Sequence, residues 1–420
     1  MNSVLVVGGG GREHAICVAL AKSPKVDKLY CLPGNAGIAE IAECAPVSAT
    51  DLEGVLAFVK SHPDIGMTVV APDDPLAMGM VDMLEENGFR AFGPRKNAAI
   101  IEASKAFSKK LMKKYGIPTA DYREFDDHAE ACEYVKSAKY PLVVKADGLA
   151  LGKGVVICNT VEEALAALEE MMVDKKFKAA GNVVVIEEFL TGKEVSVLAF
   201  TDGKTIVPMV SSQDHKRAHD NDEGANTGGM GTFSPSKAYT PDIAKETEEK
   251  IILPTMRAMN AEGRTFKGVL YFGLMLTAEE VKVLEYNARF GDPETQVVLP
   301  RLKSDLYEIF DAVIDERLED IRIEWDDEAA VCVIMASGGY PGSYRKGVPI
   351  EIGALDPDIT IYHAGTARDA EGRLVTSGGR VLGVTAKGKD IDEARAKAYA
   401  NVGRIKFDGA FWRTDIGIKK

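Results

Sequence analysis

The feature that most constrains the fold is a short apolar run near the N-terminus that leads into four consecutive glycines. Residues 3–7 read Ser-Val-Leu-Val-Val, a continuous strand of the kind that is buried on both faces in a parallel sheet. The glycines Gly8 to Gly11 follow, and then a helical stretch that ends before Pro24. Residues 28–31 and 67–71 are further strand candidates with helical stretches between them. This alternation predicts a doubly wound α/β domain at the N-terminus.

The glycine turn has a chemical meaning as well as a structural one. A helix N-terminus behind a glycine turn binds anions, because its free N–H groups and the helix dipole both face the ligand. Arg12 and the segment 33–37, Pro-Gly-Asn-Ala-Gly, add polar groups nearby. A nicotinamide dinucleotide site is rejected, because Glu13 stands at the last glycine position of Gly-x-Gly-x-x-Gly. We expect a phosphate cradle, with a tight turn that binds nothing as the alternative and His14 as a structural hydrogen-bonding residue.

Length and composition exclude several classes of protein. A chain of 420 residues is too long for one core and indicates two to four domains. The net charge of −13 argues against a nucleic-acid partner. The six cysteines contain no CxxC pair, which indicates a reducing compartment without structural zinc. No apolar run approaches the ~20 residues of a membrane span, and the first strand leaves no room for a signal peptide. We therefore expect a cytoplasmic enzyme without membrane partners.

Residues 140–158 contain a second pattern that indicates phosphate binding. A strand over residues 140–146 is followed by the loop Asp-Gly-Leu-Ala-Leu-Gly-Lys-Gly and by a second strand over residues 155–158. Lys145 stands at the base of the loop and Lys153 at its tip, so a flexible glycine loop could close over a triphosphate. It is not a Walker loop, since Gly154 and a strand follow the lysine. A bare hairpin with a mobile tip is the alternative.

Polar segments follow in the next part of the chain. The strand 182–190 ends at residues whose backbone groups, from Glu187 to Leu190, could meet an adenine edge. The long polar stretches 211–220 and 226–231 are typical of a binding loop or a disordered segment, and Asp214, Lys216 and the glycines favour binding. His215 and His219 have an i,i+4 spacing, but without an acidic third ligand a zinc site is disfavoured.

The strongest candidate site lies in residues 268–296. Two strand-like runs, 268–276 and 281–287, are separated by a short polar break and predict a hairpin. Strict alternation would point Val281, Val283, Glu285 and Asn287 to one face. Carboxylate and amide oxygens side by side suit a hard cation such as Mg²⁺. The guanidinium of Arg289 follows at once, so this end of the hairpin favours a substrate rich in negative charge, with an ordinary solvated strand end as the alternative.

From Trp325 onward the pattern changes to short strands and turns with one helix, residues 391–405. This change predicts a separate C-terminal α+β domain that has no catalytic constellation of its own.

Taken together, these stretches resemble the ATP-grasp superfamily and, within it, the phosphoribosylamine–glycine ligase (glycinamide ribonucleotide synthetase) family of purine biosynthesis. The resemblance covers essentially the whole chain. The motifs that carry it are Gly9-Gly-Gly-Arg-Glu-His14, Pro33-Gly-Asn-Ala-Gly37, Lys145-Ala-Asp-Gly-Leu149 with Gly152-Lys-Gly154, Ile186-Glu-Glu-Phe-Leu190, Ser212-Gln-Asp-His-Lys-Arg217, Asn226-Thr-Gly-Gly-Met-Gly231 and Asn287-Ala-Arg-Phe-Gly-Asp-Pro-Glu294.

The resemblance implies a mixed α/β and α+β chain of four parts. These are an N-terminal α/β domain that binds phosphoribosylamine (1–102), a central ATP-grasp domain (103–122 and 191–324), an ATP-grasp lid (123–190) and a C-terminal domain (325–420). The implied activity is the ATP-dependent ligation of glycine to 5-phosphoribosylamine through glycyl phosphate, giving glycinamide ribonucleotide, ADP and phosphate. Another ATP-grasp carboxylate–amine ligase and a non-catalytic nucleotide-binding module are the alternatives. A monomer is expected, with a dimer as the alternative.

The resemblance also assigns residues to roles. Lys145 and Arg289 would be catalytic. ATP would meet Lys105, Lys145, Gly148, Gly152, Lys153, Gly154, Glu187, Glu188, Phe189, Leu190 and Glu194. The substrates would meet Gly9, Gly10, Gly11, Arg12, Asn35, Asp214, Lys216, Asn226 and Arg289. Mg²⁺, or Mn²⁺ in its place, would be held by Glu285 and Asn287.

The metal site departs from the superfamily pattern in one respect. Many ATP-grasp enzymes carry another carboxylate on the neighbouring strand, where this chain has Tyr271, Gly273 and Met275. Phosphate oxygens or water are therefore expected to complete the metal shell.

Overall fold

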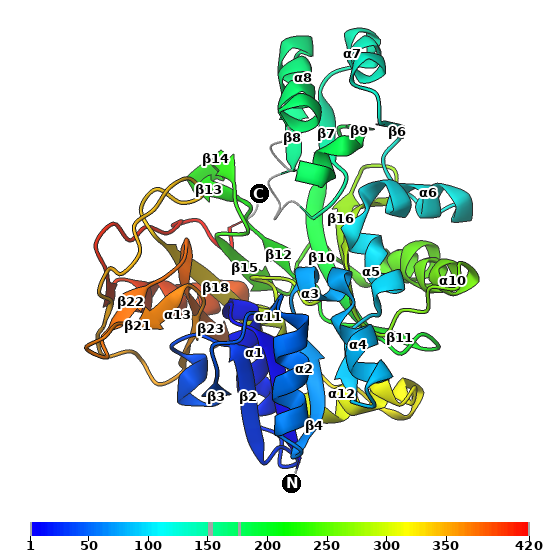
Figure 1. The fold of residues 1–420 in the computed structure, drawn as a ribbon. Coiled ribbons are helices and arrows are strands. Elements are labelled where there is room, and N and C mark those ends of the chain that lie inside the picture. Colours follow the sequence, from blue (N-terminus) through cyan, green and yellow to red (C-terminus); the bar gives the residue numbers. More distant parts are fainter. Residues whose placement is uncertain (1, 150–153, 175–177, 419–420) are drawn as a thin grey trace.

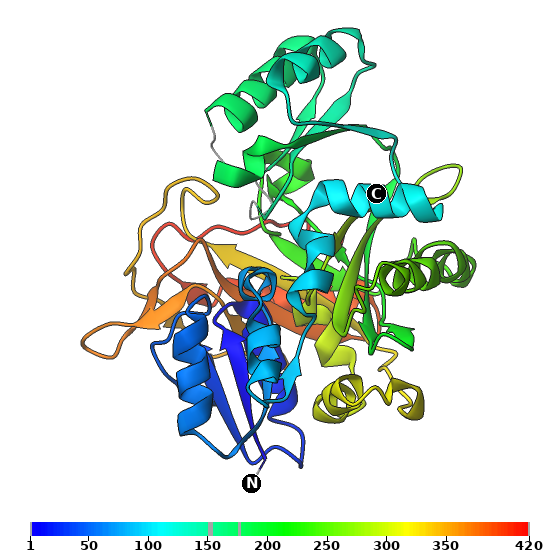
Figure 2. The ribbon, with the colours of Figure 1, turned by 45° about the vertical axis from the view of Figure 1, so that its right-hand side comes forward.

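The computed structural model describes residues 2–149, 154–174 and 178–418 of the chain. Figures 1 and 2 show one unit that stands apart at the top of the molecule, above a broader body that contains both chain ends. Within the described residues, no helix combines the length and the apolar character that a membrane crossing requires.

The N-terminal unit is a parallel sheet with the strand order β3-β2-β1-β4-β5. Its strands are β1 (Ser3–Gly8), β2 (Lys28–Pro33), β3 (Glu43–Cys44), β4 (Ile65–Val70) and β5 (Ala91–Phe92). Its helices are α1 (Gly11–Leu20), α2 (Leu52–Ser61), α3 (Asp73–Met78), α4 (Met80–Glu86) and α5 (Lys96–Ala103). Leu5 and Val7 belong to one core cluster, whereas Val4 and Val6 belong to another. The first strand is thus buried on both faces, and the predicted doubly wound sheet is confirmed.

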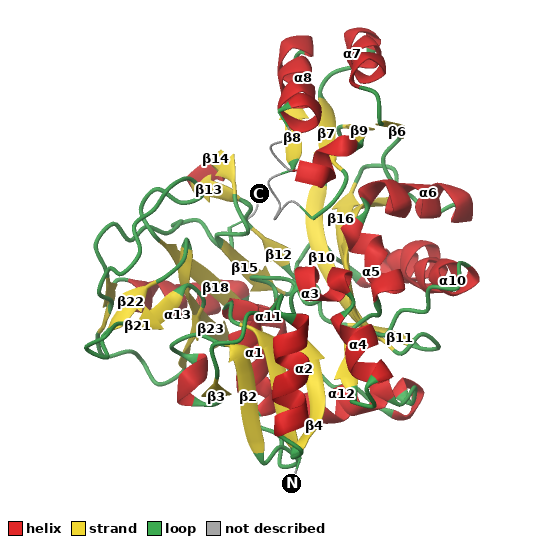
Figure 3. Cartoon of the chain, viewed as in Figure 1, coloured by secondary structure: helices red, strands yellow, loops and turns green. Residues whose placement is uncertain are grey.

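The unit at the top of Figure 1 is a four-stranded sheet with the order β6-β9-β7-β8. It contains β6 (Tyr122–Phe125), β7 (Leu142–Ala146), β8 (Val155–Cys158), β9 (Val184–Glu188), α7 (His128–Ser137) and α8 (Val161–Leu168). Its apolar side chains form a core cluster of their own. Figure 3 shows the two helices side by side at the outer end of the unit. We call residues 122–188 the lid unit below.

The central unit is an antiparallel sheet with the order β11-β10-β16-β17. Its strands are β10 (Lys193–Thr201), β11 (Ile206–Pro208), β16 (Gly268–Leu276) and β17 (Val281–Asn287). Its helices are α6 (Lys105–Tyr115), α9 (Pro241–Thr247), α10 (Leu253–Ala261), α11 (Thr295–Val298) and α12 (Leu306–Ile314). Its core clusters also include side chains of the N-terminal sheet. The two units therefore share their apolar interior.

A third large sheet, with the order β12-β15-β18-β23-β20, joins the central segment to the C-terminal segment. It contains β12 (Gln213–Asp214), β15 (Gly231–Ser234), β18 (Ala329–Ala336), β20 (Ile359–His363) and β23 (Arg380–Gly388), and α13 (Ile391–Val402) packs on it. Three small ladders pair β13 (Arg217–His219) with β14 (Glu223–Asn226), β19 (Glu351–Ile352) with β24 (Ile405–Lys406), and β21 (Thr366–Arg368) with β22 (Leu374–Thr376). The C-terminal strands thus extend a sheet that begins before residue 325.

Candidate active site

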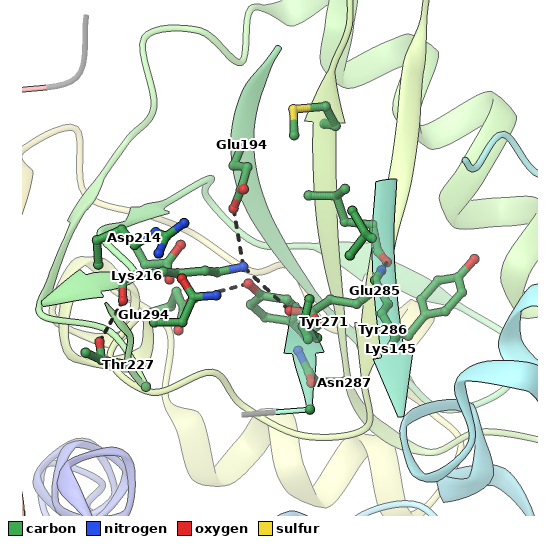
Figure 4. A pocket seen from close by; sticks show the side chains of 18 of the residues that line it. Lys145, Glu194, Asp214, Lys216, Thr227, Tyr271, Glu285, Tyr286, Asn287 and Glu294 are labelled. Carbon is green, nitrogen blue, oxygen red and sulfur yellow. Dashed lines mark hydrogen bonds and ion pairs between the residues drawn. The ribbon is translucent and has the colours of Figure 1, made fainter. Parts of the chain in front are cut away.

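A cavity of about 1030 Å³ lies where these units meet. Its lining includes Arg12 and Asp73 from the N-terminal unit, Lys145 from the lid unit, Glu285 from the central sheet and Arg380 from the C-terminal segment. Figure 4 shows the part of the cavity around the β16–β17 hairpin. Most of the residues proposed from the sequence line this space.

The predicted hairpin is confirmed, but the predicted alternation along its second strand is wrong. Gly273 pairs with Glu285, and the next pair is Leu274 with Val283, so Leu284 is an extra residue that forms a β-bulge. The bulge reverses the alternation, and Val281, Val283 and Tyr286 all pack in the apolar core. Glu285 and Asn287 consequently face the cavity, on the opposite side of the strand from the two valines.

The pair Glu285 and Asn287 fits a hard cation. Burial alone would raise the pKa of Glu285, but Lys216, Lys145 and Lys105 lower it below the usual value and keep the carboxylate ionised. The described residues contain no group of three or more His, Cys, Asp or Glu side chains placed to hold a metal ion. The two oxygens are therefore suited to a cation that also binds phosphate oxygens or water.

Two predicted phosphate-binding lysines line the cavity from different units. Lys105, the first residue of α6, donates to the carbonyl of Gly148 at 2.9 Å. Burial lowers its pKa, while Glu285 acts in the opposite direction. Lys145, on β7, donates to the carbonyl of Leu284 at 3.2 Å and lies 2.9 Å from Glu187 Oε2. Gly154 also lines the cavity. The predicted contacts of Gly152 and Lys153 lie outside the described residues.

The exit of β9 lies against the cavity as the sequence indicated. Glu187, Glu188, Phe189 and Leu190 all contribute to the lining. The carboxylate of Glu187 is directed to lysines, and that of Glu188 accepts from the Asp121 N–H and from Lys282. The predicted adenine contact, which uses backbone groups, stays a prediction.

Lys216 lies among several carboxylates that line the cavity. Its amine lies 3.3 Å from Glu194 and 3.7 Å from Glu285, and Figure 4 shows Asp214 and Glu294 beside it. Glu194, together with Asp214 and Glu285, raises the pKa of Lys216 well above its usual value against the effect of burial. Asp214 is on β12 and Asn226 ends β14, so short strands fix the polar stretch that the sequence identified as a binding loop.

Arg289 is anchored by carboxylates from the N-terminal part of the chain. Its guanidinium lies 2.8 Å from Glu102 and 3.8 Å from Asp73. Burial opposes its charge, but these two carboxylates raise the pKa of Arg289. Burial raises the pKa of Glu102 to about 7, with Arg289 acting against that rise. Glu102 was not identified from the sequence, because a single glutamate within a helical run gives no signal of a buried ion pair.

The glycine turn forms the N-terminus of α1, but its details differ from a simple open cradle. The Gly10 N–H donates to the Glu13 side chain at 2.6 Å. A Cβ at Gly9 would meet the Gly34 carbonyl at 2.4 Å, and one at Gly11 would meet Gln296 at 2.6 Å. Gly9 is therefore required for close packing of the backbone, whereas the contact at Gly11 is with the end of a flexible side chain.

Of the five residues assigned to phosphoribosylamine in this region, Gly9, Gly10, Gly11, Arg12 and Asn35, Arg12 lines the cavity. The Asn35 amide donates to the carbonyls of Gly9 and His363 and accepts from the N–H groups of Gly37 and Ile38. Its hydrogen-bonding capacity is used by the loop itself. These bonds give Asn35 a structural role in the loop, and its contact with substrate stays a prediction.

Glu294 and Lys109 are among the cavity residues that were not predicted. Glu294 accepts from Tyr271 at 3.1 Å, and burial, followed by the charge of Asp214, raises its pKa to about 7. It lies within the recognised motif, so its position could have indicated a role. Lys109 is four residues after Lys105 on the same face of α6, a spacing that could also have been used.

Arg380 gave no such signal, because the sequence indicated no site in the C-terminal segment. Its guanidinium donates to the carbonyls of Gly228 and Asp292 at 2.6 and 2.9 Å and lies 3.1 Å from the Asp292 carboxylate. Burial alone would raise the pKa of Asp292, but Arg380 and Arg12 lower it. The C-terminal segment therefore contributes directly to the wall of the cavity.

Comparisons with known proteins agree along the whole chain. Three family models match: phosphoribosylglycinamide synthetase N domain over residues 2–102, its ATP-grasp (A) domain over residues 103–295 and its C domain over residues 330–419. A phosphoribosylamine–glycine ligase of Halalkalibacterium halodurans is 49% identical over 418 residues, covering 99% of this chain and 97% of that protein. The enzyme of that name from Caldanaerobacter subterraneus is 48% identical, with 98% and 99% covered.

A solved structure gives the same picture in three dimensions. The crystal structure of a phosphoribosylamine–glycine ligase from Thermotoga maritima superposes with a TM-score of 0.84 at 36% sequence identity. The match covers 99% of this chain and 100% of that one. The overall fold described above is therefore similar to that of a solved relative.

Proposed function

The chain belongs to the phosphoribosylglycinamide synthetase family, and from this premise we propose that its cavity ligates glycine to 5-phosphoribosylamine at the expense of ATP. The products are glycinamide ribonucleotide, ADP and phosphate, and the reaction is a step of purine biosynthesis. One observation carries the assignment to this cavity. The cavity brings together amines suited to phosphates, paired oxygens suited to a hard cation, and a buried guanidinium beside them.

The chemistry requires activation of a poor electrophile. An oxygen of the glycine carboxylate attacks the γ-phosphorus of ATP, the bond to ADP breaks, and glycyl phosphate forms. Lys105 and Lys145 hold phosphate oxygens, and Arg289 stabilises the charge on the phosphoryl group in transfer. Glu102 and Asp73 fix the guanidinium in place, so little reorganisation is needed as charge develops.

The second step uses the other substrate. The amine of phosphoribosylamine attacks the acyl carbon, phosphate leaves with one former carboxylate oxygen, and the amine gives up a proton. Asp214, Lys216 and Asn226 surround glycine in this proposal, and Arg12 faces phosphoribosylamine. Closure of the cavity by the lid unit would exclude water, which would otherwise hydrolyse the acyl phosphate.

Glu285 and Asn287 would hold Mg²⁺, with Mn²⁺ as the alternative. A cation held there would neutralise charge on the phosphates. The donor set fits, because an ionised carboxylate and an amide oxygen face the cavity on one side of β17. Glu285→Gln keeps the shape and removes the charge. We expect Mg²⁺ affinity and ATP turnover to fall at least about tenfold, with the thermal unfolding temperature unchanged. Near wild-type activity at low Mg²⁺ would refute the role of Glu285.

Substrate-dependent ADP release tests the function itself. Full turnover should need both glycine and phosphoribosylamine, and glycine labelled with heavy oxygen in its carboxylate should yield labelled inorganic phosphate. Turnover with a different carboxylate or amine would instead assign another ligase activity to the same cavity. Unlabelled phosphate would contradict the acyl phosphate intermediate.

The cellular setting follows from the same proposal. All six cysteines are free, which accords with a reducing compartment, and we place the enzyme in the cytoplasm. We propose that it acts as a monomer, because one chain supplies every residue assigned above. Light scattering at micromolar concentration would reveal a dimer.

A further inference from the structure

Three lysines line the nucleotide side of the cavity, and they differ in how far their amines are already used. Among the described residues, Lys105 contacts the carbonyl of Gly148, and Lys145 contacts the carbonyl of Leu284 and the carboxylate of Glu187. Lys109 contacts Thr119 Oγ1 at 2.8 Å, the Ala120 carbonyl at 3.4 Å and Glu187 Oε1 at 3.2 Å. Two of these contacts are hydrogen bonds, to Thr119 and Ala120, and the contact with Glu187 is an ion pair, so the buried amine of Lys109 is directed at protein groups.

Glu187 is the group that connects two of these lysines. Its carboxylate lies between Lys109 and Lys145, with one oxygen toward each. The side chains of Lys109 and Glu187 are 2% and 3% exposed, and that of Lys145 is 10% exposed. Interactions between such buried charges are screened little by solvent. The charge of each of these three side chains therefore affects how strongly the other two can attract a ligand.

The charges of the two lysines and the glutamate sum to one net positive charge. Two ammonium groups share one carboxylate, so the cluster has a net charge of about +1 when Lys109 is protonated. Burial lowers the pKa of Lys109 to about 8, with Glu187 acting against that shift, and the amine is accordingly mostly protonated at pH 7. Without the charge on Lys109, Glu187 and Lys145 would cancel each other.

We propose that Lys109 is a positioning residue for nucleotide binding, whose buried ammonium neutralises Glu187 and so leaves the charge of Lys145 available to the phosphates. The inference rests on the proposed binding of ATP in this cavity. Lys109 itself does not touch the nucleotide. Its effect reaches the phosphates through Glu187 and Lys145.

A second set of contacts supports this placement. Thr119, which accepts from Lys109, donates its own hydroxyl proton to the Val283 carbonyl at 2.7 Å. Lys145 donates to the carbonyl of the next residue, Leu284, at the bulge beside Glu285. Lys109, which lies on α6, thus connects β9 of the lid unit to the strand that presents the metal ligands. Loss of its charge would act where the lid unit meets the central sheet.

A double-mutant cycle separates the charge effect from simple structural damage. The variants are Lys109→Met, Glu187→Gln and the two combined. The measured quantity is the dissociation constant of MgATP by calorimetry, without glycine or phosphoribosylamine. Lys109→Met should weaken MgATP binding about tenfold, as expected for the loss of about one unit of nearby charge. The double variant should return to within about threefold of wild type, because its net charge equals that of the wild-type cluster.

Two controls sharpen the result. Lys110→Met removes the neighbouring lysine, whose exposed amine pairs with Glu124, and should leave MgATP binding unchanged. Lys109→Arg keeps the charge and should bind more tightly than Lys109→Met. Unchanged binding by Lys109→Met, or a double variant as weak as Lys109→Met, would overturn the inference. Wild-type protein that binds no MgATP would instead refute the proposed function, on which the inference depends.

Discussion

His14 is buried at a junction between the first and last parts of the chain. Its Nδ1 accepts from the His363 N–H at 2.8 Å, and its ring meets the edge of Tyr362 at a centroid distance of 5.8 Å. Burial, followed by the nearby His363, lowers the pKa of His14 to about 3. The ring is therefore neutral in the folded protein, and the structural hydrogen-bonding role expected from the sequence is the one observed.

This depressed pKa predicts a loss of stability in acid. The unfolded chain binds a proton at His14 below its ordinary value of 6.5, whereas the folded chain does so near 3, so stability is present above pH 6.5 and falls as the pH decreases. At pH 5 the cost from this residue is about 2 kcal/mol. Urea titrations at pH 7 and pH 5 should show a smaller loss for His14→Gln than for wild type. Equal losses would contradict the assignment.

At the scale of elements, the β16–β17 hairpin shows what a period-two pattern could not predict. The two apolar runs identified the strands correctly, and Glu285 and Asn287 were correctly expected side by side. The bulge at Leu284 was missed, because its cause is the pairing with Gly273 and Leu274 rather than any local residue preference. A one-residue irregularity of this kind exchanges the two faces of a strand.

The prediction at this scale concerns the hydrogen bonds that connect the loop after β7 to α6. Asp147 accepts from the Ser104 hydroxyl at 3.2 Å and from the Ala106 N–H at 3.0 Å, which ties the loop after β7 to the first turn of α6. Asp147→Ala should cost about 1 kcal/mol of stability and release the loop that contacts Lys105. MgATP binding should then weaken about fivefold.

The matched control is Asp127→Ala. Asp127 caps α7 through the Glu130 N–H in the outer part of the lid unit, and it does not line the cavity. It should lose a similar amount of stability, measured by thermal unfolding, without any change in MgATP affinity. If both variants bind MgATP equally well, the hydrogen bonds of Asp147 have no role in nucleotide binding.

At the scale of the whole molecule, the sequence predicted the doubly wound sheet and the lid strands, and most of the site residues that it proposed line the cavity, because each depends on local patterns and ordered motifs. The contribution of the C-terminal segment to the cavity wall could not be predicted in this way. Arg380 begins β23, which pairs with β18 and β20 in the third sheet. Its contacts with Gly228 and Asp292 arise from the pairing of β18 with β15, which no local pattern encodes.

Arg380 therefore offers a test of whether the C-terminal segment takes part in catalysis. Its forked guanidinium holds the Gly228 loop and the Asp292 turn together. Arg380→Lys keeps the charge beside Asp292 but cannot make this forked set of bonds. Ligation turnover should fall about tenfold while MgATP binding changes less than about twofold, because Arg380 contacts Gly228 and Asp292 and not the lysines assigned to the phosphates.

The control for this variant is Arg345→Lys, since Arg345 pairs with Asp408 in an exposed ion pair of the same segment. That change should leave both turnover and binding at the wild-type level, because exposed pairs contribute little. The two variants are compared by ADP release under saturating substrates and by calorimetry with MgATP. If Arg380→Lys turns over like Arg345→Lys, the C-terminal segment covers the cavity without shaping the reaction. If MgATP binding is lost with turnover, Arg380 instead supports the cavity as a whole.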